Sequence, residues 1–113
     1  PQLPSAAPPP SPVGRLIDMD TMGIPIIEAG SVTGRMFINL QLDVTSENAD
    51  AIKLVMPRLQ SAFLMELLTY LPRHLHDHDK LDTTLLQQQL LQVAHRVARG
   101  KVRGVLVKNF TQQ

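Results

Sequence analysis

The feature that most constrains this fold is a run of strict alternation over residues 36–44, which reads M-F-I-N-L-Q-L-D-V. Five aliphatic side chains occupy every second position, and the residues between them are largely polar. They are Met36, Ile38, Leu40, Leu42 and Val44. Successive side chains of a β-strand point to opposite faces, so this run predicts a strand with one face in a core and the other towards water.

Further strands are predicted on both sides of this run. Residues 102–110, V-R-G-V-L-V-K-N-F, are rich in β-branched side chains and predict a terminal strand. Leu16-Ile17 and residues 24–27 are shorter strand candidates, and Pro25 assigns the second to a sheet edge. Residues 28–34, E-A-G-S-V-T-G, are rich in turn formers and predict a hairpin loop.

The first predicted helix follows the alternating strand, where Thr45, Ser46 and Asn48 are candidates for its N-cap. Its apolar stripe comprises Ile52, Val55, Met56, Leu59, Phe63, Leu67 and Tyr70. Pro57 removes one backbone hydrogen bond inside this stripe, yet the stripe continues in phase beyond it. We therefore expect one helix that is kinked at Pro57 and ends at Pro72, with Met65 among its core residues.

The second predicted helix starts after a polar connection and is capped by Asp82. Its apolar stripe comprises Leu86, Leu90, Val93 and Val97, and Gly100 is the expected residue just past its end. Three Phe, one Tyr and no Trp require an aliphatic core. The pattern predicts an α/β fold of the α+β kind, a small domain with antiparallel strands packed against two helices.

A proline-rich leader precedes this domain, and residues 1–12 contain six of the nine prolines. Proline fixes φ and lacks an amide donor, so the leader is expected to be extended and semi-rigid. We divide the chain into a linker at residues 1–14 and a domain at residues 15–113. The alternative is a terminal tail without a role.

Composition and motifs exclude several kinds of chemistry. A net charge of +1 gives no support for a nucleic-acid partner, and the absence of cysteine rules out thiolate catalysis. The serines lack a G-x-S-x-G context, and the glycines form no phosphate-binding loop. We therefore predict a protein that is not an enzyme and holds no cofactor.

The candidate metal ligands are His74, His76 and His78, in the run H-L-H-D-H-D. Imidazole and carboxylate groups suit Zn²⁺ and Ni²⁺. A catalytic metal needs rigid ligands, however, and this run lies in the predicted connection between the helices. We favour a solvated loop, with a metal-dependent function as the least favoured alternative.

Two segments resemble the periplasmic domain of the FliL family of flagellar basal-body-associated proteins. The first is P-R-L-Q-S-A-F-L-M-E-L-L at residues 57–68, and the second is K-V-R-G-V-L-V-K-N-F-T-Q-Q at residues 101–113. The residues that fall on the family pattern are Pro57, Leu59, Gln60, Ser61, Ala62, Val102, Val105, Leu106, Phe110 and Gln113. The resemblance spans roughly residues 16–113.

This resemblance implies a stomatin-like fold in the bacterial periplasm, tethered by an inner-membrane helix upstream of the chain. It also implies self-association into a ring and contact with flagellar stator and basal-body proteins, in a scaffold that supports stator assembly or torque. We expect ring contacts on the exposed face of the first helix and the edge of the terminal strand, with Arg58, Glu66, Arg103 and Lys108 as contact candidates. The alternative is a stomatin-like adaptor of another envelope complex.

Overall fold

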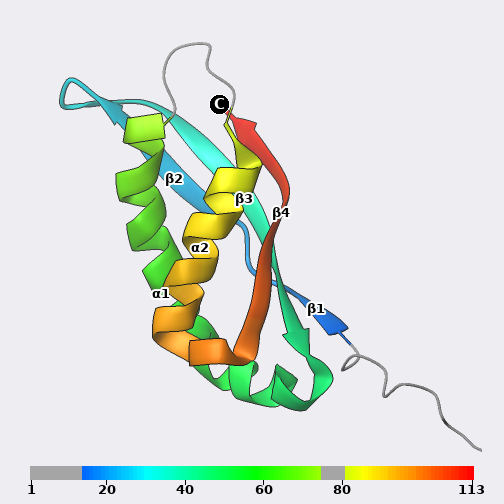
Figure 1. The fold of residues 1–113 in the computed structure, drawn as a ribbon. Coiled ribbons are helices and arrows are strands. Elements are labelled where there is room, and N and C mark those ends of the chain that lie inside the picture. The colour runs from blue at the N-terminus through cyan, green and yellow to red at the C-terminus, as the bar shows by residue number, and fades with distance from the viewer. Residues whose placement is uncertain (1–13, 75–80) are drawn as a thin grey trace, which may run out of the picture.

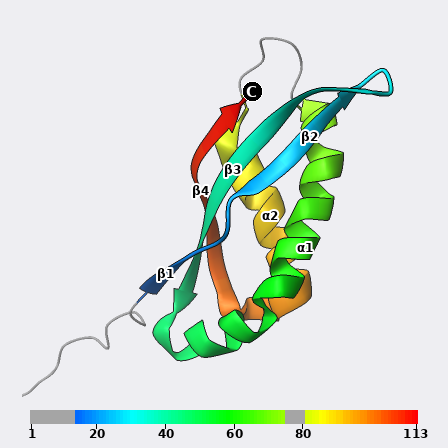
Figure 2. The same ribbon diagram turned by 180° about the vertical axis from the view of Figure 1, so that it is seen from behind.

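The computed structural model describes residues 14–74 and 81–113 and shows a four-stranded antiparallel sheet with two helices. Both helices lie on the same face of the sheet, as the two opposite views show (Figures 1 and 2). The strands are β1 (Gly14–Asp18), β2 (Met22–Glu28), β3 (Ser31–Thr45) and β4 (Val102–Gln112), and the helices are α1 (Ala49–His74) and α2 (Thr83–Ala98). Short 3₁₀ turns at Ser46–Asn48 and Arg99–Lys101 lead into α1 and β4. The predicted α+β fold is confirmed.

The long strand β3 organises the sheet. β1 pairs with residues 41–45 of β3, and β2 pairs with residues 31–38. β4 pairs with residues 36–44 and therefore runs along the opposite edge of β3 from both. The predicted edge position of β2 agrees with this arrangement. The sheet thus has one face that no element of the described residues covers, because α1 and α2 share the other; we call it the uncovered face.

The core lies between the sheet and the two helices, and the alternating aliphatic residues of β3 form its sheet side. All five predicted aliphatic residues of β3 are buried at 1% exposure or less. α1 contributes Ile52, Leu59, Phe63, Leu67, Tyr70 and Leu71, and α2 contributes Leu86, Leu90, Val93, Ala94 and Ala98. The predicted core stripes of both helices therefore face the sheet.

The loop predicted at residues 28–34 is wrong in extent. The β2–β3 turn consists of Ala29 and Gly30, and Glu28 already pairs with Ser31 in the ladder. Both turn residues have positive φ, 51° and 81°, as a tight hairpin turn requires. The turn formers at residues 31–34 lie in β3, where pairing with β2 provides hydrogen bonds that local sequence does not reveal.

Helix α1 runs without interruption through both of its prolines. The expectation of a single helix across Pro57 is confirmed, and the kink at Pro57 stays a prediction. The predicted end at Pro72 is wrong, because α1 continues to His74. Burial of Leu71 and a hydrogen bond from His74 Nδ1 to the Tyr70 carbonyl (3.0 Å) stabilise this last turn.

Both ends of α2 fall where the sequence predicts, with Gly100 directly after the C-cap Arg99, but the backbone at the C-terminal end differs from the expected one. Asp82 is the N-cap, as predicted, and its side chain accepts a hydrogen bond from the Leu85 amide at 3.1 Å. At the other end, the residue with positive φ is Arg99 (φ 56°) rather than Gly100. The helix ends at Ala98 and the chain turns at once towards β4, so the reversal falls one residue before the glycine.

Candidate functional site

The outward face of α1 carries an apolar surface that nothing in the described chain covers. We define the outer stripe as Leu54, Pro57, Ser61, Leu64, Met65 and Leu68, all of which are exposed. Leu54 is 84% exposed, Met65 68%, Leu68 40% and Leu64 36%. Burial of large apolar side chains is the main favourable term in association, so the outer stripe is a candidate contact surface.

The helical period explains why this surface lies opposite the core. At about 100° per residue, Leu54, Ser61 and Leu68 fall within a narrow arc on one side of the helix. Ile52, Phe63 and Tyr70 then fall on the opposite side, towards the sheet. A surface helix of a globular protein is usually polar on its outer side. α2 follows that rule apart from Leu85 near its start, with Gln88, Gln92, His95 and Arg96 exposed, whereas α1 does not.

The outer stripe was missed by the sequence prediction, which assigned Met65 to the core. That assignment is wrong, since Met65 lies on the outer face. Periodicity identifies the strongest apolar stripe and sets aside residues that are out of phase with it. A usable signal existed in the spacing of Leu54, Ser61 and Leu68, which recur every seven residues on a second face.

The uncovered face of the sheet holds Arg103 and Lys108, and both are engaged in ion pairs. Arg103 donates to Asp43 Oδ1 at 3.0 Å, and Lys108 Nζ lies 3.4 Å from Asp18 Oδ1. Gln41 also donates to Asp18 Oδ1 at 2.7 Å. This hydrogen bond, followed by the Lys108 charge, holds the pKa of Asp18 below its usual value. The uncovered face therefore carries these ion pairs and hydrogen bonds together with exposed apolar side chains, among them Leu16 (55%) and Leu106 (38%).

The outer edge of β4 is partly occupied by side chains of α2. Gln87 Oε1 accepts a hydrogen bond from the Val107 amide at 2.8 Å. His95 Nε2 donates to the Val102 carbonyl at 3.2 Å. Unpaired backbone groups of an edge strand invite pairing with another chain, and such side-chain bonds reduce that tendency. The first half of β4 is thus a poor template for strand addition.

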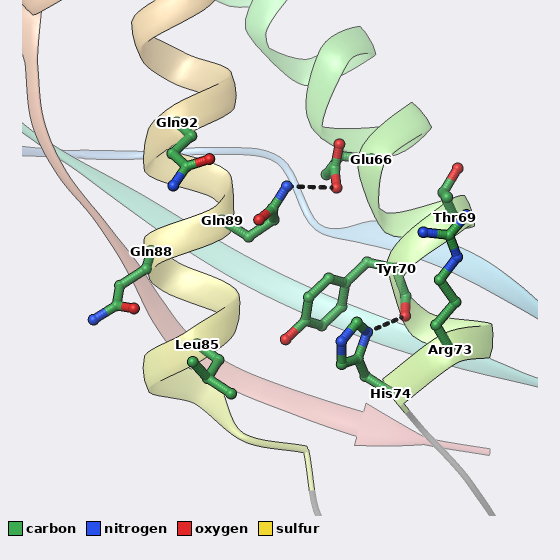
Figure 3. Close-up of a pocket in the computed structure, with 9 residues that line it drawn as sticks. All are labelled: Glu66, Thr69, Tyr70, Arg73, His74, Leu85, Gln88, Gln89 and Gln92. Carbon is green, nitrogen blue, oxygen red and sulfur yellow. Dashed lines mark hydrogen bonds between the residues drawn. The ribbon is translucent and has the colours of Figure 1, made fainter.

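Glu66 lies in a cleft of about 290 Å³ between α1 and α2 (Figure 3). Its carboxylate accepts a hydrogen bond from Gln89 at 3.0 Å and lies 3.9 Å from Arg96. The Tyr70 ring stacks on His74 at 3.9 Å between centroids. Burial, and then the Asp82 carboxylate, raise the pKa of the Tyr70 phenol. The contacts of Glu66 with Gln89 and Arg96 join the two helices, whereas the Tyr70–His74 stacking lies within α1, so the cleft serves packing within the domain.

The histidine run is described in part. His74 closes the last turn of α1 with its Nδ1 bond to Tyr70, while His76 and His78 lie outside the described residues. Within residues 14–74 and 81–113, no group of three His, Cys, Asp or Glu side chains could hold a metal ion. The metal-binding alternative stays a prediction.

The four predicted contact residues lie on different surfaces. Arg58 is exposed on α1 beside the outer stripe, and Glu66 faces the cleft towards α2. Arg103 and Lys108 lie on β4, on the face of the sheet away from the helices. The structure does not bring the four together, and Arg58 alone adjoins the exposed apolar surface. Their role in partner contact stays a prediction.

Comparison with known proteins does not assign a family. No protein-family model matches the chain, and no curated protein matches it. In the part of the chain that the structure describes, neither helix is long and apolar enough to cross a membrane. The functional argument therefore rests on the surfaces described above and on the resemblance in two segments.

Proposed function

We propose that this chain is a non-enzymatic scaffold domain that works by presenting contact surfaces. The observation that carries the proposal is the outer stripe of α1, where Leu54 and Met65 extend apolar side chains into solvent. An outward apolar helix face lowers the solubility of an isolated domain, and association with a partner offsets that disadvantage. The cleft between α1 and α2 is lined mostly by polar residues, and the exposed Leu16 and Leu106 of the sheet lie among the polar partners Asp43 and Gln41.

The specific setting we propose is the bacterial periplasm, at the flagellar stator. The support is the resemblance of residues 57–68 and 101–113 to the FliL family. Ser61 of that pattern lies on the outer stripe, while Leu59, Val102 and Val105 lie in the core. In this proposal a helix upstream of the chain spans the inner membrane, and the proline-rich leader holds the domain away from it.

The test is removal of the gene in its host, followed by fluorescence microscopy of labelled stators and by motility assays at low and high load. We expect fewer stators at the motor, or lower torque under load. Complementation by a Met65→Glu variant tests the outer stripe, with Gln92→Glu on α2 as the matched control. Unchanged motility and stator recruitment after deletion, under high load as well, would reject the flagellar setting.

The second candidate keeps the scaffold and changes its setting, to another complex of the cell envelope. It rests on the same outer stripe and differs in the partner. Neighbouring genes discriminate between the two, because motility genes beside this one favour the stator. The gene sequence upstream of Pro1 tests both. A run of ~20 apolar residues with basic residues on its cytoplasmic side is expected, and its absence would reject both tethered settings.

A further inference from the structure

We infer that the outer stripe of α1 binds the same stripe of a second copy of this chain, in an antiparallel arrangement about a two-fold axis through Ser61. In place of the ring contact expected on this face, the inference names a two-fold contact, so it specifies a symmetry that the proposed function leaves open. It rests on the pattern of side chains along α1, on their exposure and on the charges at the two ends of the helix.

The first argument is that the outer stripe is nearly symmetric about Ser61. Large apolar residues flank Ser61 at equal spacing, with Leu54 seven residues before it and Leu68 seven residues after it. Pro57 and Met65 lie four residues before and four after. Two antiparallel copies therefore place Leu54 against the second copy's Leu68, and Pro57 against its Met65. A two-fold contact requires such self-complementarity.

The second argument is that a small side chain lies at the centre, where two helices approach most closely. Packed helices lie about 8–10 Å apart, and their Cα atoms lie about 2.3 Å from each axis. The two Ser61 Cα atoms are then about 3.4–5.4 Å apart. Serine fits the upper part of this range, where two facing Cβ atoms have room, and the larger side chains of Leu54 and Leu68 fill the space towards the ends.

The third argument is charge complementarity between the ends of α1. Its first turn carries Asp50, and its last turn carries Arg73 and His74. An antiparallel pair brings the acidic start of each helix beside the basic end of the other. The helix dipoles oppose each other in the same arrangement. Arg73 and His74 line the cleft towards α2, so it is mainly the opposed helix dipoles that favour the antiparallel orientation.

The size of the surface predicts a weak and reversible contact. The stripe from Leu54 to Leu68 is about 21 Å long at 1.5 Å per residue. Four exposed apolar side chains on one helix bury less than the ~800 Å² per partner that is typical of stable complexes. Such a contact becomes effective when copies are concentrated, for example on a shared membrane or in a larger assembly.

Disulfide trapping tests the inference on the purified chain, which contains no native cysteine. Ser61→Cys is expected to form a covalent dimer rapidly under mild oxidation, because the Cα separation estimated above overlaps the disulfide range of about 4.4–6.8 Å. Leu54→Cys and Leu68→Cys should each cross-link slowly alone and rapidly when mixed. Gln92→Cys, on the exposed side of α2, is the matched control and should remain monomeric.

A second variant separates association from folding. Met65→Glu, added to Ser61→Cys, should reduce the cross-linking rate at least tenfold with an unchanged circular dichroism spectrum, since Met65 is already largely exposed. Ser61→Cys cross-linking no faster than Gln92→Cys would overturn the inference. Rapid self-linking of Leu54→Cys would overturn it too, because it indicates a parallel pair. A normal stator phenotype after gene deletion leaves this result untouched, so the two proposals fail independently.

Discussion

The backbone after the end of α2 gives a sharp test of the structure. A positive φ at a helix end is expected at a glycine, and here it falls at Arg99 instead of Gly100. Arg99 has φ 56° and ψ −136°, a combination that glycine reaches readily and other L-residues rarely adopt. Gly100, the next residue, has no positive φ, and a Cβ added there meets nothing within 4 Å. The structure therefore predicts that glycine is more useful at position 99 than at position 100.

The magnitude follows from two opposing terms. Replacing Arg99 by glycine relieves backbone strain of about 1–3 kcal/mol. The greater freedom of glycine in the unfolded chain costs about 0.5–1 kcal/mol. Arg99→Gly should therefore raise the free energy of unfolding by about 0–2.5 kcal/mol. For a domain of this size, each ~1 kcal/mol moves the melting temperature by roughly 4–8 °C.

The matched variants are Gly100→Ala and Gly30→Ala, measured by urea denaturation and thermal melting. Gly100→Ala should be neutral or should add about 0.4–1 kcal/mol, because alanine restricts the unfolded chain. Gly30→Ala should cost about 1–2 kcal/mol, because Gly30 has φ 81° in the hairpin turn. Two results together would refute this reasoning: Arg99→Gly destabilises the domain, and Gly100→Ala costs as much as Gly30→Ala. They would mean that Gly100, and not Arg99, has the positive φ after α2.

Three further predictions concern the core, the helix cap and the phenol. Phe63→Ala should lower the free energy of unfolding by about 3–5 kcal/mol in urea titrations, because the ring is fully buried, and a loss below ~1 kcal/mol would contradict its core position. Asp82→Ala should cost about 1 kcal/mol through the lost Leu85 bond, and Asp82→Asn, which keeps an acceptor, should cost less. The raised pKa of Tyr70 means that its stabilising contribution is complete below the unfolded-state pKa of about 10 and is lost as pH rises through the folded value. Between about pH 9 and 11, the urea midpoint of Tyr70→Phe should therefore fall less than that of the wild type. An equal fall in both proteins would contradict the raised pKa of Tyr70.

The metal alternative has a direct test in calorimetric titration with Zn²⁺. We expect the wild type and His78→Ala to bind Zn²⁺ with the same weak affinity, as a solvated loop would. A wild-type affinity at least tenfold higher than that of His78→Ala would instead favour a built site in the histidine run.

Local periodicity predicted the elements of this fold well where one face of an element is buried. The alternation at residues 36–44 and the stripe from Ile52 to Tyr70 both identified the core face, because burial against the sheet selects one side of each element. The Asp82 cap was predictable as well, since it depends on a hydrogen bond to a residue three positions away.

Features that depend on more than one element were not predictable in the same way. The ion pairs of Arg103 and Lys108 join β4 to residues about 60 and 90 positions earlier in the chain. The bonds from Gln87 and His95 to β4 depend on how α2 lies along the sheet edge. The sequence prediction treated Arg103 and Lys108 as candidate contacts for a partner, and the structure shows that both have ion-pair partners within the chain.

The sequence by itself determined the order of the main elements and most of the residues that form the core, because these follow from periods of 2 and 3.6 residues along the chain. The tertiary structure alone decided which surfaces remain uncovered. α1 is apolar on two sides. Periodicity assigned Ile52 and Phe63 to the core, and only packing reveals that the side with Leu54 and Met65 faces solvent. The exposure of a side chain depends on which elements pack beside it, and that packing depends on contacts between residues far apart in the chain.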